Sequence, residues 1–290
     1  MSLKEKALLV KVGVHKASFE KRERGVAKKV AEEYEMNEAL MKTRKSTFLK
    51  EDVQALKKVM NKVLPTVYEN TLPYRDGGWR LLSVDLHEKL EEELRKISNE
   101  LQDVKEEFRK NYENYKEKAR KELGKLYNPL DYPPVDYFMS RFSFDTIYEP
   151  IPDSNDIRVD MEKDVVEKLR KELEDANEKR LKKATEEAWN RIVEALTRLH
   201  ERLTAETEVD EEGNVKQPRL FKSLIENIRD LVDILPALNI TNDAEMEEVR
   251  KKLDEEFAEL DIKDLKEDED LKKEVAKKAE ELLENIENIM

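Results

Sequence analysis

The stretch that decides the fold runs SVDLHEKLEEELRKISNELQDVKEEFRKNYENYKEKARKELGKL, from Ser83 to Leu126. Apolar residues recur along it at alternating spacings of three and four, which is typical of a heptad-like seam on one face of a helix. No proline interrupts the stretch, and Ser83 is a suitable N-cap. About 43 residues at 1.5 Å per residue predict a rod of roughly 65 Å. The seam consists of Leu86, Leu90, Leu94, Ile97, Leu101, Val104, Phe108, Tyr112, Tyr115, Ala119, Leu123 and Leu126.

A second stretch of nearly the same length, from about Asp160 to Leu203, carries another apolar seam. Two equal seams cannot both stay exposed, so the pair predicts an antiparallel coiled-coil hairpin. Small residues in the middle of the second seam would face large aromatic residues on the first, which allows close packing. The residues expected to meet are Ala184 and Ala188 on one helix and Phe108, Tyr112 and Tyr115 on the other.

The flanking sequence predicts a small sheet covered by helices. Residues 8–15 alternate between apolar and polar side chains, which indicates a strand. The run RFSFDTIY predicts a second strand over residues 142–149, paired with residues 8–15 although the two lie far apart in the sequence. Residues 79–82 predict a short third strand. Helical periodicity over Lys21–Lys45 and Lys50–Asn70 predicts the covering helices.

The fold class is therefore mainly α, with a long antiparallel coiled-coil hairpin, a small α+β head and a C-terminal helical segment. The predicted domains are the head (1–82 plus 127–158), the hairpin (83–126 plus 159–205) and an acidic helical segment (206–290). The last segment contains amphipathic helices over about 220–235 and 269–289, joined to the second rod by a loop or short hairpin.

Composition excludes several classes of function. Charged residues make up 42% of the 290 residues, there are six glycines, and there is no cysteine. Disulfides, thiol nucleophiles and cysteine-ligated metal sites are therefore excluded. The sequence has no P-loop, no dinucleotide-binding glycine motif and no nucleophile elbow. We expect no enzyme, no cofactor and no metal site.

No apolar run is long enough for a signal peptide or a membrane span. We therefore expect a cytoplasmic protein with no membrane contact.

Charge is distributed unevenly along the chain, whose formal net charge is −13. Residues 1–82 carry 18 basic and 11 acidic residues, whereas residues 241–290 carry 9 basic and 19 acidic residues. The basic part indicates a possible phosphate contact, so a nucleic-acid-associated protein is one alternative function. The acidic part indicates another, a decoy that inhibits a host nucleic-acid-binding defence protein. For both parts a solvated helix surface is the simpler interpretation. The candidate basic face consists of Lys21, Arg22, Arg24, Lys28 and Lys29.

An aromatic and arginine-rich set in the head is the candidate interaction surface, because Trp, Tyr and Arg are enriched at interface hot spots. The alternative is that these side chains form the small core that caps the rods. The set consists of Trp79, Arg80, Tyr127, Tyr132, Tyr137, Phe138 and Arg141.

Four segments resemble an uncharacterised helical family, numbered 3150 among the domains of unknown function, which occurs in bacteria and bacteriophages. They are LVKVGVHK, the Gly-Gly-Trp segment before the long helix, YFMSRFSFD and LPALNITND, within about residues 5–250. The resemblance implies a bacteriophage or bacterial origin, with the bacterial cytoplasm as location. Because the family's genes often lie beside one for a MoxR-type AAA+ ATPase, it also implies such an ATPase as partner. It supplies no functional residues.

Taken together, the sequence predicts a non-enzymatic interaction protein: a scaffold, adaptor or inhibitor that binds an AAA+ ATPase or a host protein. A homo-oligomer is a further alternative, because either seam could pair between two chains.

Overall fold

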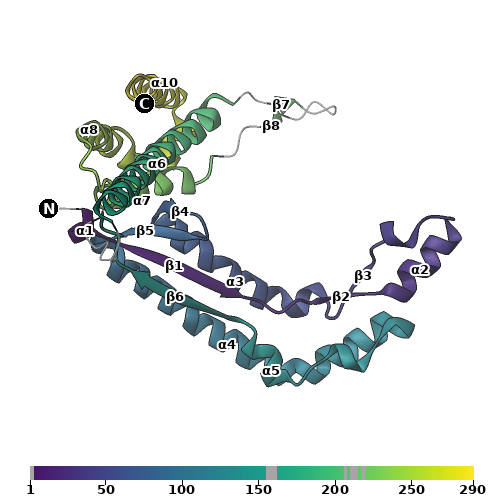
Figure 1. Ribbon diagram of the computed structural model, residues 1–290. Coiled ribbons are helices and arrows are strands. Elements are labelled where there is room, and N and C mark those ends of the chain that lie inside the picture. The colour runs from purple at the N-terminus through teal and green to yellow at the C-terminus, as the bar shows by residue number, and fades with distance from the viewer. Residues whose placement is uncertain (1–2, 155–161, 206–207, 210–214, 217–219) are drawn as a thin grey trace. The chain divides into compact units, whose positions relative to one another are not determined.

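The computed structural model describes residues 3–154, 162–205, 208–209, 215–216 and 220–290. The chain is mainly helical, with one four-stranded antiparallel sheet (Figure 1). It divides into two compact units, whose boundaries differ from those of the three domains expected above. The first unit comprises Met1–Lys11, Asn70–Glu88 and Ile147–Met290, and the second unit comprises Val12–Glu69 and Lys89–Thr146.

The sheet has the strand order β4-β5-β1-β6. All three predicted strands are confirmed, and β1 and β6 are neighbours in the sheet as expected. The fourth strand was missed, because Pro73 interrupts its strand pattern. Gly77 and Gly78 adopt φ of +80° and +83° and form the turn between β4 and β5. The strands are β1 (Ala7–His15), β4 (Leu72–Arg75), β5 (Trp79–Ser83) and β6 (Ser143–Glu149).

Both predicted long helices are present, as α4 (Val84–Leu123) and α6 (Lys163–Thr204). The structure does not show them as a coiled-coil hairpin. Helix α6 contacts α10, α7 and β4, and its buried positions begin only at Ala184. The predicted interface between alanines and aromatic residues is wrong, because Phe108 of α4 instead packs against Phe48 and Phe138. Equal seam length indicated that both helices need partners, but it did not identify them.

The single helix predicted over Lys21–Lys45 is also wrong. The helical pattern ends at Glu33, and Glu35 adopts a left-handed φ of 51° that stops the helix. The segment is a two-stranded ribbon that carries a shorter helix between its strands. Its elements are β2 (Glu20–Arg22), α2 (Arg24–Glu33), the 3-10 turn η1 (Glu38–Leu40) and β3 (Arg44–Ser46).

Helix α3 (Lys50–Glu69) follows and confirms the second predicted helix, with Pro65 in its last turns. It buries the predicted apolar stripe, which includes Val53, Leu56, Val59, Met60 and Val63. A short helix, α1 (Leu3–Lys6), precedes the sheet.

The C-terminal part of the first unit is helical, as predicted. Helices α6 and α10 pack together, with Ala188, Ile192, Ala279 and Leu282 buried. Asp243 caps α8 and also accepts a hydrogen bond from the Trp189 indole. A short hairpin, β7 (Glu208–Val209) with β8 (Val215–Lys216), follows α6. The later elements are α7 (Ser223–Leu238), α8 (Ala244–Leu253), the π-helical η5 (Asp254–Ala258), α9 (Ile262–Glu267) and α10 (Glu269–Ile289).

Within the described residues, no helix is long and apolar enough to cross a membrane.

Candidate interaction surface

The second unit contains an aromatic core, assembled from segments far apart in the sequence. Phe138 lies on the short helix α5 (Val135–Ser140), is 6% exposed and contacts Phe19, Phe48 and Phe108 at ring-centroid distances of 5.7–6.0 Å. Edge-to-face and offset pairs of this kind add to the stability gained from burial. We name as the aromatic core Phe19, Phe48, Phe108, Tyr112, Tyr132, Phe138 and Phe142.

Residues 20–46 leave this core and return to it, and we call them the arm (Figure 1). Its two ends meet, because the Thr47 backbone N–H donates to the carbonyl of Phe19 at 2.7 Å and the Thr47 hydroxyl donates to the same oxygen at 3.0 Å. The adjacent residues Phe19 and Phe48 both insert into the aromatic core. The arm therefore has a fixed base, formed by its two flanking residues.

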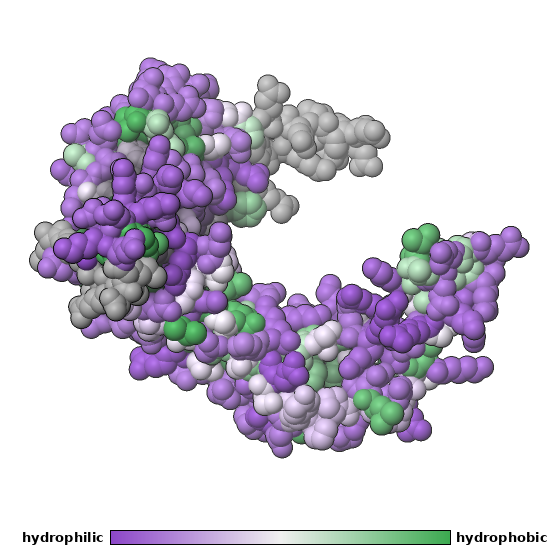
Figure 2. Space-filling model, in the orientation of Figure 1, coloured by the Kyte–Doolittle hydropathy of each residue, from purple (hydrophilic) through white to green (hydrophobic). Residues whose placement is uncertain are grey.

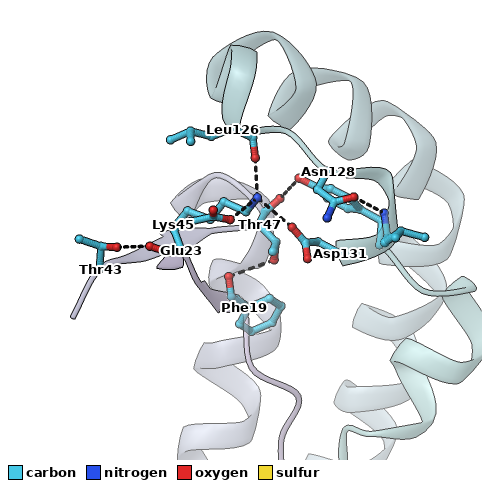
Figure 3. A network of polar contacts seen from close by, with 10 residues as sticks. Phe19, Glu23, Thr43, Lys45, Thr47, Leu126, Asn128 and Asp131 are labelled. Atoms are coloured by element: carbon cyan, nitrogen blue, oxygen red, sulfur yellow. Dashed lines mark hydrogen bonds and ion pairs between the residues drawn. The ribbon is translucent and has the colours of Figure 1, made fainter. Parts of the chain in front are cut away.

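A buried lysine ties the arm to the segment that follows α4. Lys45 is 8% exposed, and its ammonium group lies 2.6 Å from a Glu23 carboxylate oxygen and 2.9 Å from one of Asp131 (Figure 3). It also donates to the carbonyl of Leu126. Asp131 and Leu126 belong to the 3-10 turns η3 (Pro129–Asp131) and η2 (Gly124–Leu126).

Burial by itself lowers the pKa of Lys45, but hydrogen bonds and charges from Glu23 and Asp131 outweigh it, and the pKa is raised. The lysine therefore stays charged, and the network fixes the arm on one side of its base. Removing the lysine would leave two carboxylates without their cation.

Large apolar side chains are exposed on the arm and on the neighbouring turns. Tyr34 is 71% exposed and Leu40 76% on the arm, while Leu130 is 89% and Tyr137 57% exposed beyond α4. Figure 2 shows hydrophobic side chains on the arm among strongly hydrophilic ones. We take these four exposed residues as the candidate contact positions of the second unit.

The residues predicted to form an aromatic surface differ in burial and in their contacts. Tyr132 and Phe138 are part of the aromatic core, and Tyr127 stacks on Tyr132 at 5.1 Å. Tyr137 and Arg141 are exposed, and the Arg141 guanidinium donates to the Tyr137 hydroxyl at 3.2 Å.

Trp79 and Arg80 belong to the first unit, where they have structural contacts. The Arg75 guanidinium lies 4.7 Å from the centroid of the Trp79 ring, and Lys11 also lies over that ring. Arg80 donates to the hydroxyl of Thr71 at 2.6 Å and to its carbonyl at 2.9 Å.

The predicted basic face lies on the arm, and all five of its residues are exposed. Lys21 and Arg22 are in β2, whereas Arg24, Lys28 and Lys29 are in α2. The structure adds two exposed cations that the sequence did not single out, Lys42 and Arg44.

The described residues contain no group of three or more His, Cys, Asp or Glu side chains that could hold a metal ion. The nearest arrangement is a pair in the second unit, in which His15 Nε2 lies 2.7 Å from Asp145 Oδ1, with both side chains exposed. His87 instead packs against the ring of Tyr148 at 5.2 Å.

Sequence reasoning missed the arm as a unit and its anchor, Lys45. One signal for the arm was present, since Phe19 and Phe48 bracket a highly charged segment. No sequence pattern distinguished Lys45 from the other lysines, because its burial depends on Asp131, more than eighty residues away.

Comparison with known proteins finds no matching family model, no similar curated protein and no similar solved structure.

Proposed function

We propose that this chain is a non-enzymatic interaction protein, a scaffold, adaptor or inhibitor, and that the arm and neighbouring turns are its contact surface. The observation that carries the proposal is the exposure of Tyr34, Leu40, Leu130 and Tyr137, each more than half accessible to water. Burying a large apolar side chain contributes about 1.5–3 kcal/mol, so a partner that covered several of them would gain substantially.

The class of partner is inferred from the sequence resemblance and from the mixture of apolar and charged residues on the surface. The resemblance described above implies an AAA+ ATPase in a bacterial or bacteriophage setting, and a host protein is the other protein partner expected from the sequence. For either of them, apolar anchors surrounded by charged residues form the kind of surface that combines affinity with specificity.

A nucleic-acid-associated function is the second candidate, and the exposed cations of the arm favour it. Four carboxylates at the far end of the arm oppose it, because they would repel phosphates. They are Glu32, Glu33, Glu35 and Glu38. Fluorescence anisotropy with a labelled DNA duplex tests this candidate: binding that weakens steeply with added salt would support it, and no binding at low salt would reject it.

Site-specific photo-cross-linking tests the main proposal. A benzoylphenylalanine placed at Leu40 or Leu130 should cross-link to a defined second protein in cells that express the full chain. The matched control is the same group at Tyr68, which is 49% exposed on α3. The cross-link from Leu130 should also weaken when Tyr34 is changed to Asp. If neither Leu40 nor Leu130 cross-links more than Tyr68 does, the proposal is wrong.

A further inference from the structure

Charged side chains on α2 are placed against the dipole of their own helix. The N-terminus of a helix carries partial positive charge and its C-terminus partial negative charge. In α2, Arg24 and Lys28 lie in the first half and Lys29 follows directly, whereas Glu32 and Glu33 lie at the end. The first turn has no acidic residue, and the last turn has no basic one. The N-cap residue, Glu23, makes no side-chain capping bond. This arrangement costs stability, which the exposed pair of Lys28 with Glu32, at 3.8 Å, offsets only in part.

The ribbon below α2 has a second unfavourable placement. Arg22 and Arg44 lie directly opposite each other in the antiparallel pairing of β2 with β3. Like charges in such cross-strand positions are destabilising. Arg44 gains one partner, Glu20, at 3.2 Å. Violations of local rules that concentrate in one exposed segment are expected where function, rather than folding, has set the sequence.

Most of the arm's cations have no ion-pair partner in the part of the chain that the structure describes. Glu20, Glu23 and Glu32 are paired with Arg44, Lys45 and Lys28, respectively. The other cations are exposed and form no ion pair with any residue that the structure describes. These are Lys21, Arg22, Arg24, Lys29 and Lys42. These exposed cations are therefore available to bind an anionic partner.

The apolar residues of the arm decide the class of that partner. A phosphate backbone makes no use of Tyr34 and Leu40, which are 71% and 76% exposed. An acidic amphipathic helix has both carboxylates and apolar side chains to offer. The arm's surface fits such a helix better than it fits a nucleic acid.

This chain itself contains a helix with the complementary properties. From residue 279 to residue 290, the second half of α10 carries four glutamates and no lysine or arginine. These four glutamates are exposed. The last turn of α10 has no basic residue, so the acidic charge at this end also opposes the helix dipole. Met290 is 60% exposed at the end of the helix. The glutamates are Glu280, Glu281, Glu284 and Glu287.

We propose that the arm of one copy binds the second half of α10 of another copy. The exposed cations of the arm then face the exposed glutamates of α10, and Met290 covers part of the exposed surface of Tyr34 and Leu40. Because the two surfaces differ, the contact is head-to-tail, and successive copies can add to a chain or a ring. This inference rests on the proposed function of the arm as a protein contact.

Sedimentation velocity of the full chain tests the inference. At about 50 mM salt the mass should rise with protein concentration, and about 500 mM salt should suppress the rise. An arm variant, Arg22→Glu with Arg24→Glu, should weaken association by at least about tenfold, as should a tail variant, Glu284→Lys with Glu287→Lys. Two of these substitutions, Arg24→Glu and Glu287→Lys, remove charges that oppose a helix dipole, so loss of folding is not expected to explain the result.

Two controls sharpen the test. Mixing the arm variant with the tail variant should restore association, because each supplies a surface that matches the other. The variant Lys110→Glu with Lys121→Glu makes the same change in net charge as the arm variant, at exposed positions of α4. It should leave association unchanged.

A chain that stays monomeric at high concentration and low salt overturns the inference, as does equal loss in the arm variant and in the Lys110/Lys121 control. Duplex DNA that binds the arm of a monomeric chain overturns it too. If a monomeric chain still cross-links to a different protein through Leu40, the inference is wrong but the proposed function stands. If neither Leu40 nor Leu130 cross-links more than Tyr68 does, both are wrong.

Discussion

The aromatic core and the arm adjoin each other in the same compact unit, yet they follow opposite rules. In the core, rings such as Phe138 are buried and packed edge to face against their neighbours. In the arm, charges oppose the dipole of α2, two arginines face each other across a ribbon, and Tyr34 and Leu40 are exposed to water. The comparison fits a core that holds the unit together and an arm that, as proposed above, contacts a partner. Each prediction below tests one side of it.

The largest effect is expected from Phe138→Ala in the aromatic core. Removing a buried phenyl ring should lower the free energy of unfolding by about 3–5 kcal/mol, because it leaves a cavity among five other rings. Urea unfolding followed by circular dichroism measures this loss. Tyr137→Ala, at the exposed neighbouring position, is the matched control and should change the free energy by about 0.5 kcal/mol or less. Similar losses of stability in both variants would contradict the distinction between the buried core and the exposed positions beside it.

Lys45→Met should have the next largest effect, about 3 kcal/mol, because it leaves the carboxylates of Glu23 and Asp131 without their buried cation. The same urea titration measures it. Lys42→Met, at an exposed position just before β3, should be nearly neutral. If Lys45→Met were as mild as Lys42→Met, the network in Figure 3 would not anchor the arm.

Alkaline pH should destabilise the aromatic core. Burial raises the pKa of Tyr112 and that of Tyr132 to about 12, from an ordinary value of 10.0. A raised pKa means that the folded state holds its proton more tightly than the unfolded state does. The stabilisation is therefore complete below pH 10 and is lost between about pH 10 and 12, by roughly 2 kcal/mol for each tyrosine.

Unfolding midpoints measured across this pH range should fall, and the fall should be shallower in Tyr132→Phe. A slope that is the same with and without the tyrosine hydroxyl would show that other groups control the alkaline transition.

The smallest effect is expected from Arg24→Glu in the arm, and it has the opposite sign. An acidic residue at the N-terminus of α2 should stabilise the helix by about 0.3–1 kcal/mol. Hydrogen exchange should show slower exchange of α2 amides, with no change in α3. A substitution that stabilises the arm while weakening its contacts is the pattern expected of a functional segment. Faster exchange of the α2 amides would contradict the claim that the positive charge of Arg24 opposes the dipole of this helix.

The regular elements could be predicted from the sequence because their periodicity is local. The seam from Leu86 to Leu123 specified α4, and the alternation in residues 8–15 specified β1 together with its pairing to β6. The partner of α4 could not be predicted, because a seam records that a face is buried and not what covers it. Phe108 was expected against alanines of the second seam and instead packs against Phe48.

The candidate site was predicted less completely. The five cations of the basic face were identified because charge is visible in the sequence. The arm's shape was not, since a left-handed residue at Glu35 ends a helix that the apolar pattern would have continued. Burial of Lys45 depends on Asp131, and no local pattern records so distant a contact.

Hydrogen exchange of the unsubstituted chain at low and high protein concentration tests the central claim most directly. If the arm is a contact surface, amides of residues 20–46 and of the second half of α10 should gain protection as concentration rises. Amides of α5 and α3, which belong to the folded body of the second unit, should not change. Protection confined to other segments, or no protection in the arm while the sedimenting mass increases, would contradict the account.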